Sequence, residues 1–248
     1  MAVDKIRRIS VLKVPVDIVA PEDLESAIRS LYADGKNHQI VLLSMADLMR
    51  ARRSGEFRTM VTGASLVVPI SLSIVKAARM TKRAEPVRYE PFDFIIQLLG
   101  ILDRFGKSVY LFGASPRSLI KAEKNIKATF RDLRVVGRHS RRIPKGFLPK
   151  IVEAIRKSTP TLLMVGNGVP GGEKWIPRNL RNFSSGLYLW CSDVLDVFAE
   201  RRKRPAPGSF AHGLEWAHYL PRHPWRFFRF LTLFRMKILA LWYRIRGH

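Results

Sequence analysis

Two glycine-containing segments of this 248-residue sequence are the positions best suited to bind a phosphate group. Residues 165–172 read Val-Gly-Asn-Gly-Val-Pro-Gly-Gly, and residues 112–116 read Phe-Gly-Ala-Ser-Pro. Glycine lets a backbone approach a ligand closely, and a Ser-Pro pair typically opens a helix whose first N–H groups can face an anion. Neither segment has the Walker or the dinucleotide-binding spacing, so ordinary strand-to-helix turns remain the alternative. The candidate ligand-binding residues here are Gly113, Ser115, Gly166, Asn167 and Gly168.

Other residue types that do chemistry are sparse. Asp193 and Asp196 lie three positions apart, where they are suited either to a site or to capping a helix. Arg88 has the bidentate fork that pairs with a diphosphate, or it is a surface residue beside Glu90. The six histidines show no metal-ligand spacing, no GxSxG motif is present, and the single Cys191 has no partner for an intrachain disulfide. We therefore expect no metal site and no cofactor.

The elements that must position these residues alternate along the first 200 positions. Short apolar runs predict buried strands, and amphipathic periods between them predict helices. This alternation predicts an α/β, Rossmann-like fold, with a mainly parallel sheet and helices on both faces. Ligands bind at the carboxyl ends of the strands in such sheets. The predicted strands are 40–43, 65–68, 108–112, 133–136, 161–165 and 186–190, and the predicted helices begin near 20 and span 92–105, 115–127 and 145–158.

Charge separates the last 48 residues from the rest. The chain has 44 Lys and Arg against 20 Asp and Glu, a net charge of +24, which predicts an anionic partner. Residues 201–248 carry eleven of the basic residues, a single acid, Glu215, and three of the five tryptophans. We therefore divide the chain into an α/β domain at 1–200 and a basic, aromatic-rich appendage at 201–248.

Helical spacing from Pro224 onward places basic residues in one sector and apolar residues beside them. A basic amphipathic helix with aromatic residues is typical of an anionic membrane interface. A helix docked on the protein's own core or on a partner is the alternative, and no RNA- or DNA-binding module supports nucleic acid as the partner. The candidate membrane-binding residues are Trp225, Arg226, Arg229, Phe230, Lys237, Trp242 and Arg244.

Targeting signals are not predicted. Lys13, Pro15 and Asp17 interrupt the apolar stretch after the basic N-terminus, and no run of 18 uncharged apolar residues occurs. We expect a cytoplasmic protein that lies peripherally on the inner face of the membrane.

Several segments resemble the WecG/TagA/CpsF family of glycosyltransferases, over about residues 40–229. Residues 51–57 and 64–69 are similar to the family's "ARxxxEFR" and "ADLVVP" segments. Residues 160–175 resemble "PDILFVGLGSPKQEKW" and keep Gly166, Gly168, Pro170, Glu173, Lys174 and Trp175. Lys203, Arg204 and residues 213–216 resemble the closing "KRAP" and "GLEW".

The resemblance implies transfer of an N-acetylated amino sugar from a UDP-sugar to a polyprenol-linked acceptor at the membrane. It adds Glu173 and Arg204 to the nucleotide-sugar-binding candidates Arg88, Gly113, Ser115, Gly166, Asn167 and Gly168. It also favours Asp196 over Asp193 as a catalytic candidate. We expect Trp175 to pack inward at the start of a helix, and in the family a similar C-terminal appendage is implicated in membrane attachment.

The departures from the family pattern fall at its polar site positions. The family's proposed catalytic Asp corresponds to Ile70, whose side chain cannot accept a proton, so no general base is available there. The family's Thr-x-Asn pair corresponds to Ser44 and Ala46, and a glycine-rich strand end reads Trp190-Cys191-Ser192-Asp193. Two hypotheses follow: a membrane-associated glycosyltransferase with lost or altered activity, and a non-catalytic scaffold in a membrane protein complex. The sequence leaves the oligomeric state open.

Overall fold

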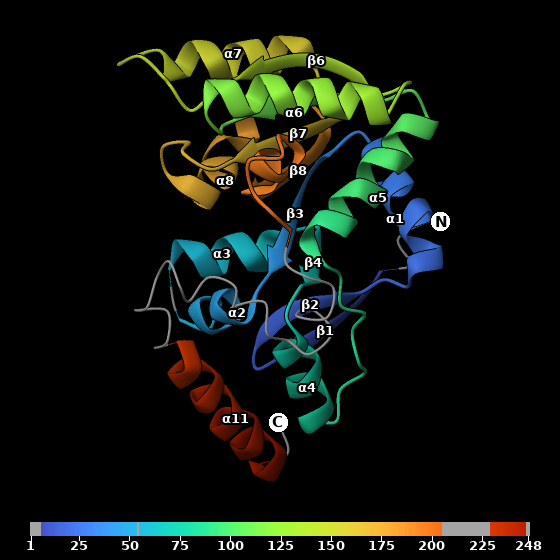
Figure 1. Cartoon of the computed structure of the whole chain (residues 1–248). Helices are drawn as coiled ribbons and strands as arrows, with labels where there is room; N and C mark the ends of the chain where they lie inside the picture. The colour runs from blue at the N-terminus through green and yellow to red at the C-terminus, as the bar shows by residue number, and fades with distance from the viewer. Residues whose placement is uncertain (1–5, 54, 205–228, 247–248) are drawn as a thin grey trace. The chain divides into compact units, whose positions relative to one another are not determined.

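Residues 6–53, 55–204 and 229–246 are described by a computed structural model of the chain (Figure 1). The chain forms two compact units, each made of separate stretches of sequence. Unit 1 contains residues 21–41 and 91–203, and unit 2 contains residues 6–20, 42–90 and the C-terminal helix.

The central sheet has six strands in the order β4-β3-β8-β7-β5-β6. Its strands are β3 (Asn37–Leu43), β4 (Leu66–Pro69), β5 (Ser108–Phe112), β6 (Arg134–His139), β7 (Leu162–Gly166) and β8 (Gly186–Ser192). The pairings of β3 with β8, β8 with β7, β7 with β5 and β5 with β6 are all parallel. Every residue of β5 and β7 is buried, as expected of strands covered on both faces. β6, at the end of the order, alternates between exposed and partly buried residues.

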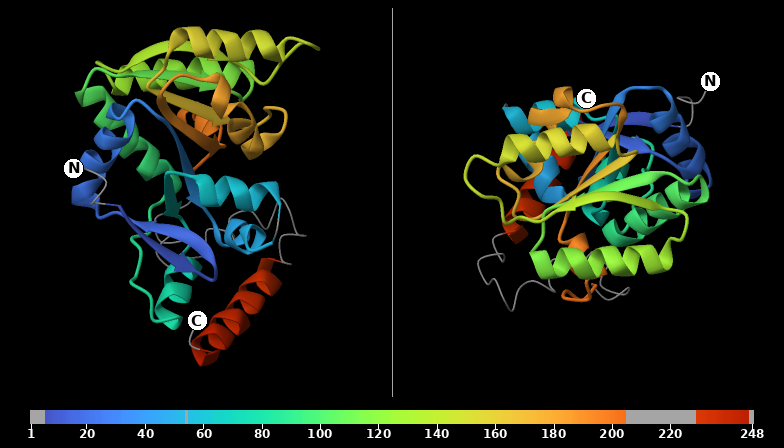
Figure 2. Two further views of the ribbon diagram at one scale, coloured as in Figure 1. Left: turned by 180° about the vertical axis from the view of Figure 1, so that it is seen from behind. Right: turned by 90° about the horizontal axis from the view of Figure 1, so that it is seen from above.

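Helices precede, connect and follow the strands of unit 1. They are α1 (Leu24–Ala33), α5 (Pro91–Arg104), α6 (Pro116–Thr129), α7 (Leu148–Ser158), α8 (Trp175–Asn179) and α9 (Val194–Phe198), with short 3₁₀ segments at Pro21–Asp23, Gly172–Lys174 and Leu180–Asn182. In the right-hand view of Figure 2, β6 runs between α7 and α6. α6 begins as its sequence predicts, because Ser115 Oγ accepts the N–H of Ser118 at 3.2 Å and Pro116 occupies the first turn.

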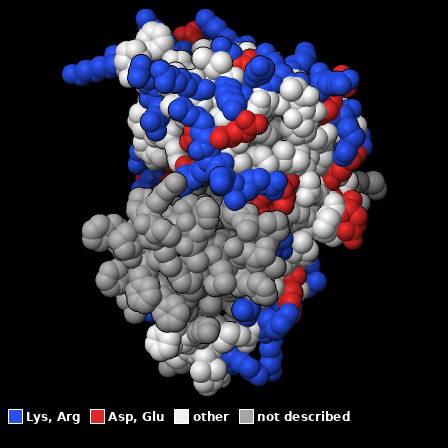
Figure 3. All heavy atoms as spheres, viewed as in Figure 1, with Lys and Arg blue, Asp and Glu red and all other residues white. Residues whose placement is uncertain are grey.

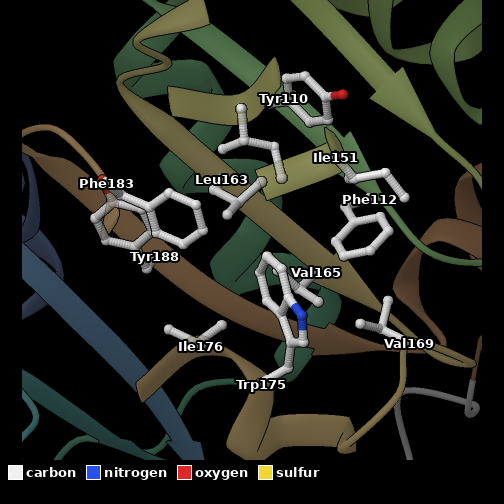
Figure 4. Packing of buried hydrophobic residues seen from close by; sticks show 11 residues of the cluster. Tyr110, Phe112, Ile151, Leu163, Val165, Val169, Trp175, Ile176, Phe183 and Tyr188 are labelled. Atoms are coloured by element: carbon white, nitrogen blue, oxygen red, sulfur yellow. The ribbon is translucent and has the colours of Figure 1, made fainter. Parts of the chain in front are cut away.

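An aromatic cluster fills one side of unit 1 (Figure 4). Trp175 is 2% exposed and packs edge-on to Phe112 and tilted against Phe183, with ring centroids 4.9 and 5.7 Å apart. Phe183 in turn stacks on Tyr188 of β8. The inward packing predicted for Trp175 is therefore confirmed.

Unit 2 opens with an antiparallel hairpin of β1 (Arg7–Val11) and β2 (Val14–Ile18). Its tight turn places Leu12 and Lys13 at positive φ. Asp17 of β2 is 2% exposed and receives both guanidinium N–H groups of Arg8, at 2.7 and 2.8 Å, and the N–H of Val67 at 2.7 Å. This fully bonded carboxylate ties the hairpin to β4.

Helices complete unit 2. They are α2 (Met45–Ala51), α3 (Glu56–Gly63), α4 (Leu72–Met80) and the C-terminal α11 (Arg229–Arg246), which contacts α2 and α4. The face of α11 that is buried against its own unit includes Met236, Ala240 and Tyr243. Docking on the protein's own core, the alternative considered for this helix, therefore accounts for one of its faces. None of the helices in the described ranges is long and apolar enough to cross a bilayer.

The predicted α/β fold with a mainly parallel sheet and a C-terminal helix is confirmed, and the predicted elements correspond to observed ones with shifts at their ends. β6 is predicted at 133–136 and observed at Arg134–His139, and β3 is predicted from residue 40 and begins at Asn37. The helix predicted from residue 145 begins at Leu148 instead. The hairpin β1–β2 and the helices α2, α3 and α4 had no predicted counterpart. The partition into 1–200 and 201–248 stays a prediction.

Candidate functional site

The carboxyl ends of four neighbouring strands in unit 1 are joined by backbone hydrogen bonds. Ala114, after β5, accepts from the N–H of Arg141, after β6, at 2.8 Å. Ala114 N–H donates to the carbonyl of Asn167 at 2.9 Å, and Asn167 N–H donates to the carbonyl of Ser192 at 3.1 Å. Ala114 and Ser192 are non-glycine residues at positive φ, 56° and 49°. Such strained positions cluster at ligand sites, so this edge is the candidate site of unit 1.

Two glycines of the candidate site are required because neighbouring groups lie close to their Cα atoms. A Cβ on Gly113, whose φ is +107°, would lie 2.6 Å from the carbonyl oxygen of Gly166. Gly168, at φ +88°, has the side chain of Arg141 directly against its Cα, where a Cβ would overlap it. Both loops therefore need glycine for packing, and this packing brings the Arg141 side chain onto the glycine-rich loop.

A polar network crosses the ends of β7 and β8. The side-chain amide of Asn167 donates to one oxygen of Asp193, and Arg202 forms an ion pair with the other oxygen. Asp193 is the N-cap of α9 by position, but its side chain makes no capping hydrogen bond. The carboxylate instead orients an amide and a guanidinium, two groups that suit a phosphate or a sugar hydroxyl.

A second basic group reaches the start of α6. Arg201 Nη1 lies 3.3 Å from Ser115 Oγ and 3.5 Å from Ser118 Oγ. The backbone N–H groups of Arg201 and Arg202 both bond to the carbonyl of Asp196, which closes the turn after α9. The sequence 201–202, which composition suggested as the start of the appendage, thus lies at the candidate site of unit 1.

Unit 2 holds three of the positions at which the sequence departs from the family pattern, Ser44, Ala46 and Ile70. Ile70 N–H donates to the carbonyl of Leu43 at 3.0 Å, and Met45 N–H donates to Ser71 Oγ at 3.1 Å. Ser44 Oγ donates to Asp47 at 2.5 Å and accepts the N–H of Asp47 at 3.2 Å, a capping box that starts α2. The loops after β3 and β4 are thus held by hydrogen bonds, while the side chain at position 70 is an inert alkyl group.

The remaining candidates are divided between the units. Asp196 lies in the first turn of α9 and Glu173 in the 3₁₀ segment before α8, both in unit 1 and both half-buried. Arg88 lies in unit 2 and is half-buried next to the buried Tyr89. Arg204 is exposed in unit 2, and its Nη2 lies 3.7 Å from Glu90.

The membrane-binding candidates fall partly on α11. Trp242 and Arg244 are exposed, whereas Trp225 and Arg226 lie outside the described residues. Arg229, Phe230 and Lys237 belong to the helix, but the described side chains do not include theirs. The exposed large apolar residues of α11 are Phe234, Ile238, Leu241, Trp242 and Ile245, with exposed fractions of 42 to 76%.

Sequence patterns missed part of this arrangement. Arg141, Arg201 and Arg202 were not singled out as site residues, and Asp193 was placed behind Asp196. The run of basic residues after α9 was the signal that pointed to Arg201 and Arg202, but nothing in the sequence placed Arg141 on Gly168. In the described ranges, no group of His, Cys, Asp and Glu side chains is arranged to hold a metal ion.

The α/β fold and the strand-end loops define the class of protein only together with its family: residues 9–248 match the profile of the WecG/TagA/CpsF family of glycosyl transferases, and the chain belongs to that family. Curated relatives share about a fifth of its residues. The chain is 22% identical over 191 residues, 77% of its length and 74% of the relative's, to the N-acetylglucosaminyldiphosphoundecaprenol N-acetyl-beta-D-mannosaminyltransferase of Bacillus subtilis strain 168. Proteins of the same name from Bacillus spizizenii strain W23 and Staphylococcus aureus strain NCTC 8325 are each 22% identical, over 84% and 85% of this chain and 80% and 83% of their own lengths.

Proposed function

We propose that this protein is a membrane-associated glycosyltransferase of altered catalytic chemistry. It binds a UDP-N-acetyl amino sugar at the strand ends of unit 1 and uses a polyprenol-linked acceptor on the cytoplasmic face of the membrane. The relatives are named as enzymes that transfer N-acetylmannosamine to a diphosphoundecaprenol-linked N-acetylglucosamine, and this name supports the proposed class of donor and acceptor. The observation that carries the proposal is the network of Asn167, Asp193 and Arg202 at the glycine-lined strand ends.

The strand ends of unit 1 carry the polar groups that binding of a nucleotide sugar requires. Arg202 and Arg141 supply guanidinium groups, which match the oxygens of a diphosphate. Asn167 supplies an amide that can donate to a phosphate oxygen or accept from a sugar hydroxyl. The backbone hydrogen bonds between the loops fix these groups before a ligand binds, which lowers the entropy cost of binding.

The proposed change in catalytic chemistry rests on the residue at position 70. Ile70 has no group that can take a proton from an acceptor hydroxyl, and general-base catalysis contributes about 10²–10⁴-fold to a reaction rate. A transfer reaction in this protein therefore lacks that contribution from position 70. Asp196 is the carboxylate that the sequence favours in place of a base at position 70. Asp193 is the carboxylate that is bonded to Asn167 and Arg202.

The first experiment is calorimetric titration of the chain with UDP and with UDP-N-acetylglucosamine. We expect micromolar binding of both, because the strand-end loops are preformed. Transfer to an undecaprenyl-diphosphate-linked acceptor is then measured with the native chain, Asp196→Ala and Asp193→Ala. Turnover that neither substitution changes would exclude both carboxylates as catalytic groups.

Restoring a carboxylate tests the role assigned to position 70. Ile70 is partly exposed, so Ile70→Asp should fold, and we expect it to raise turnover by about 10²-fold or more if the acceptor reaches this loop. The matched control is Ile70→Asn, which has the same size but accepts no proton at neutral pH. Equal rates for the two variants would contradict the assignment.

A non-catalytic scaffold is the second candidate function, and the replacement of the family's glycines by Trp190, Ser192 and Asp193 favours it. Larger residues at this strand end narrow the space for a sugar nucleotide. This candidate predicts no binding of UDP at millimolar concentration, no turnover of any donor, and co-purification of the chain with a membrane protein complex. Micromolar binding of UDP would eliminate it.

Membrane attachment through α11 rests on its exposed apolar residues, which lie beside the exposed Arg235 and Arg244. We expect Ile238→Asp with Leu241→Asp to lower binding to anionic vesicles at least tenfold without destabilising the fold, because both side chains are about half exposed. Leu239→Asp, at a partly buried position of the same helix, controls for a loss of helix docking. Unchanged vesicle binding of the double variant would exclude this face as the anchor.

A further inference from the structure

The C-terminal appendage is not the only strongly basic part of the chain. Residues 116–158, which form α6, β6 and α7, contain thirteen Lys and Arg but only three acids, Glu123, Asp132 and Glu153. This segment lies in unit 1, whereas α11 belongs to unit 2. Figure 3 shows Lys and Arg gathered over the part of the molecule that Figure 1 labels α6, β6 and α7. We call this the edge surface, because β6 is the last strand of the sheet.

The acids of the edge surface neutralise few of its cations. Glu123 pairs with Lys127 and Arg138, and Glu153 pairs with Lys157. Lys121 pairs with Glu200. For the other nine basic residues, the described part of the chain places no carboxylate within ion-pairing distance: Arg117, Lys124, Arg131, Arg134, Arg141, Arg142, Lys145, Lys150 and Arg156.

Exposed apolar side chains lie among these cations. In the described part of unit 1, the large apolar residues that are exposed are Ile120 at 57%, Val136 at 38% and Phe147 at 38%, and all three belong to the edge surface.

Ile120 and Val136 each have basic neighbours on the same face of their helix or strand. Ile120 lies one helical turn from Arg117 and Lys124 on α6. Val136 alternates with Arg134 and Arg138 along β6, all three exposed.

Phe147 has its basic neighbour at the start of α7. The ammonium group of Lys150 lies 5.3 Å from the centroid of the Phe147 ring. The pattern of an exposed apolar side chain flanked by cations thus recurs on three separate elements.

We propose that the edge surface binds an anionic lipid bilayer, as a second membrane contact independent of α11. A bilayer attracts Lys and Arg to its phosphates and accepts apolar side chains just below its headgroups, so one partner explains both features. A second copy of this chain does not fit, because it carries the same charge of +24. Single-stranded nucleic acid is bound through rows of stacking aromatic residues, and Phe147 is the one aromatic residue among the exposed large apolar residues of this surface.

The experiment measures binding of the full chain to vesicles of phosphatidylglycerol and phosphatidylcholine by co-sedimentation, without any sugar donor. The test variant is Lys124→Glu, Arg134→Glu and Lys150→Glu together, one change on each element. The control variant is Lys36→Glu, Arg58→Glu and Arg83→Glu, three exposed residues outside the edge surface with the same change of charge. Each basic residue near an anionic surface contributes about 1 kcal/mol, so the test variant should bind at least about tenfold more weakly than the control.

Two further comparisons separate this surface from the rest of the protein. The same test changes in a chain carrying Ile238→Asp and Leu241→Asp should weaken binding again by a similar factor, because the two contacts are independent. Affinity for UDP should not change in the test variant, so failure of the edge surface leaves the proposed transfer reaction untouched. If charge reversal prevents folding, the same test is made with a neutral variant, Lys124→Gln, Arg134→Gln and Lys150→Gln. This variant should also bind vesicles more weakly than the native chain.

Three results would overturn the proposal. The first is a native chain that does not bind anionic vesicles, and the second is equal binding by the test and control variants. The third is a test variant that keeps vesicle binding but loses binding to a labelled single-stranded RNA, which would assign the surface to nucleic acid.

Discussion

The side-chain amide of Asn167 donates to the carboxylate of Asp193, which joins the loop after β7 to the loop after β8. Arg202 pairs with the other oxygen of the same carboxylate. Asp193 therefore holds two donor groups, an amide and a guanidinium, at the edge of the sheet where α/β proteins bind ligands. In the resemblance described above, Asp193 corresponds to a glycine of the family pattern.

Removing the Asp193 carboxylate should weaken nucleotide binding. Asp193→Ala releases Asn167 and Arg202 from their fixed positions, and we expect the Kd for UDP to rise about tenfold, the equivalent of one hydrogen bond to a charged group. Glu200→Ala, which breaks the exposed ion pair with Lys121, is the matched control and should leave the Kd unchanged. Calorimetric titration gives both values, and equal affinities in the two variants would show that Asp193 does not organise the site.

The close contact between Gly113 and Gly166 predicts that adding one methyl group at position 113 destabilises the folded chain. In Gly113→Ala, the Cβ would meet the carbonyl oxygen of Gly166 at 2.6 Å and the residue would keep a φ of +107°. We expect a loss of about 2 kcal/mol or more in the free energy of unfolding. Gly35→Ala has positive φ but open space around it, and should cost about 1 kcal/mol. Denaturant unfolding measures both, and equal losses would show that the close contact does not matter.

The elements of unit 1 were predictable because their burial follows simple periods. All five residues of β5 and of β7 are buried, and these strands read as continuous apolar runs. β6 was placed too early because its exposed residues, such as Arg134 and Arg138, dilute the apolar run that marks a strand.

The N-terminal hairpin escaped prediction for a different reason. Lys13, Pro15 and Asp17 interrupt its apolar pattern, and the burial of Asp17 depends on Arg8 and on the N–H of Val67, which is far away in the sequence. The site shows the same limit. The glycine-rich loops can be recognised in the sequence. The contacts of Arg141 with Gly168 and of Arg202 with Asp193 cannot, because they form only when separate loops meet in the folded chain.

Asp17 supplies a test of how unit 2 is held together. Asp17→Ala leaves the Val67 N–H without its acceptor and the Arg8 guanidinium with the carbonyl of Ala64 alone. We expect a loss of about 2 kcal/mol in the free energy of unfolding, because a buried donor loses its partner while Arg8 stays partly exposed. Asp17→Asn keeps the shape and one acceptor oxygen, so we expect a smaller loss. Glu85→Gln, at the exposed ion pair with Arg79, should leave the midpoint of urea unfolding unchanged. A midpoint for Asp17→Ala equal to that of Glu85→Gln would contradict the structural role of Asp17.

The thiol of Cys191 should remain protonated in the folded protein well above neutral pH. Burial in β8 raises the pKa of Cys191 from 9.0 to about 12. The folded state therefore holds its proton while the unfolded state loses it above pH 9, so stability should fall as pH rises from 9 towards 12. The loss attributable to this group is about 1.4 kcal/mol per pH unit at most.

Comparison of the native chain with Cys191→Ala isolates this contribution from other groups that titrate at high pH, such as the buried Tyr188, whose pKa is also raised. We expect the free energy of unfolding of the native chain to decline more steeply than that of the variant between pH 9 and 11. In parallel, iodoacetamide at pH 8 should leave the folded chain unmodified and alkylate it fully in urea, because the thiol is 1% exposed. Rapid alkylation of the folded chain, or parallel pH profiles for the two proteins, would mean that β8 opens readily at the end that carries the candidate site.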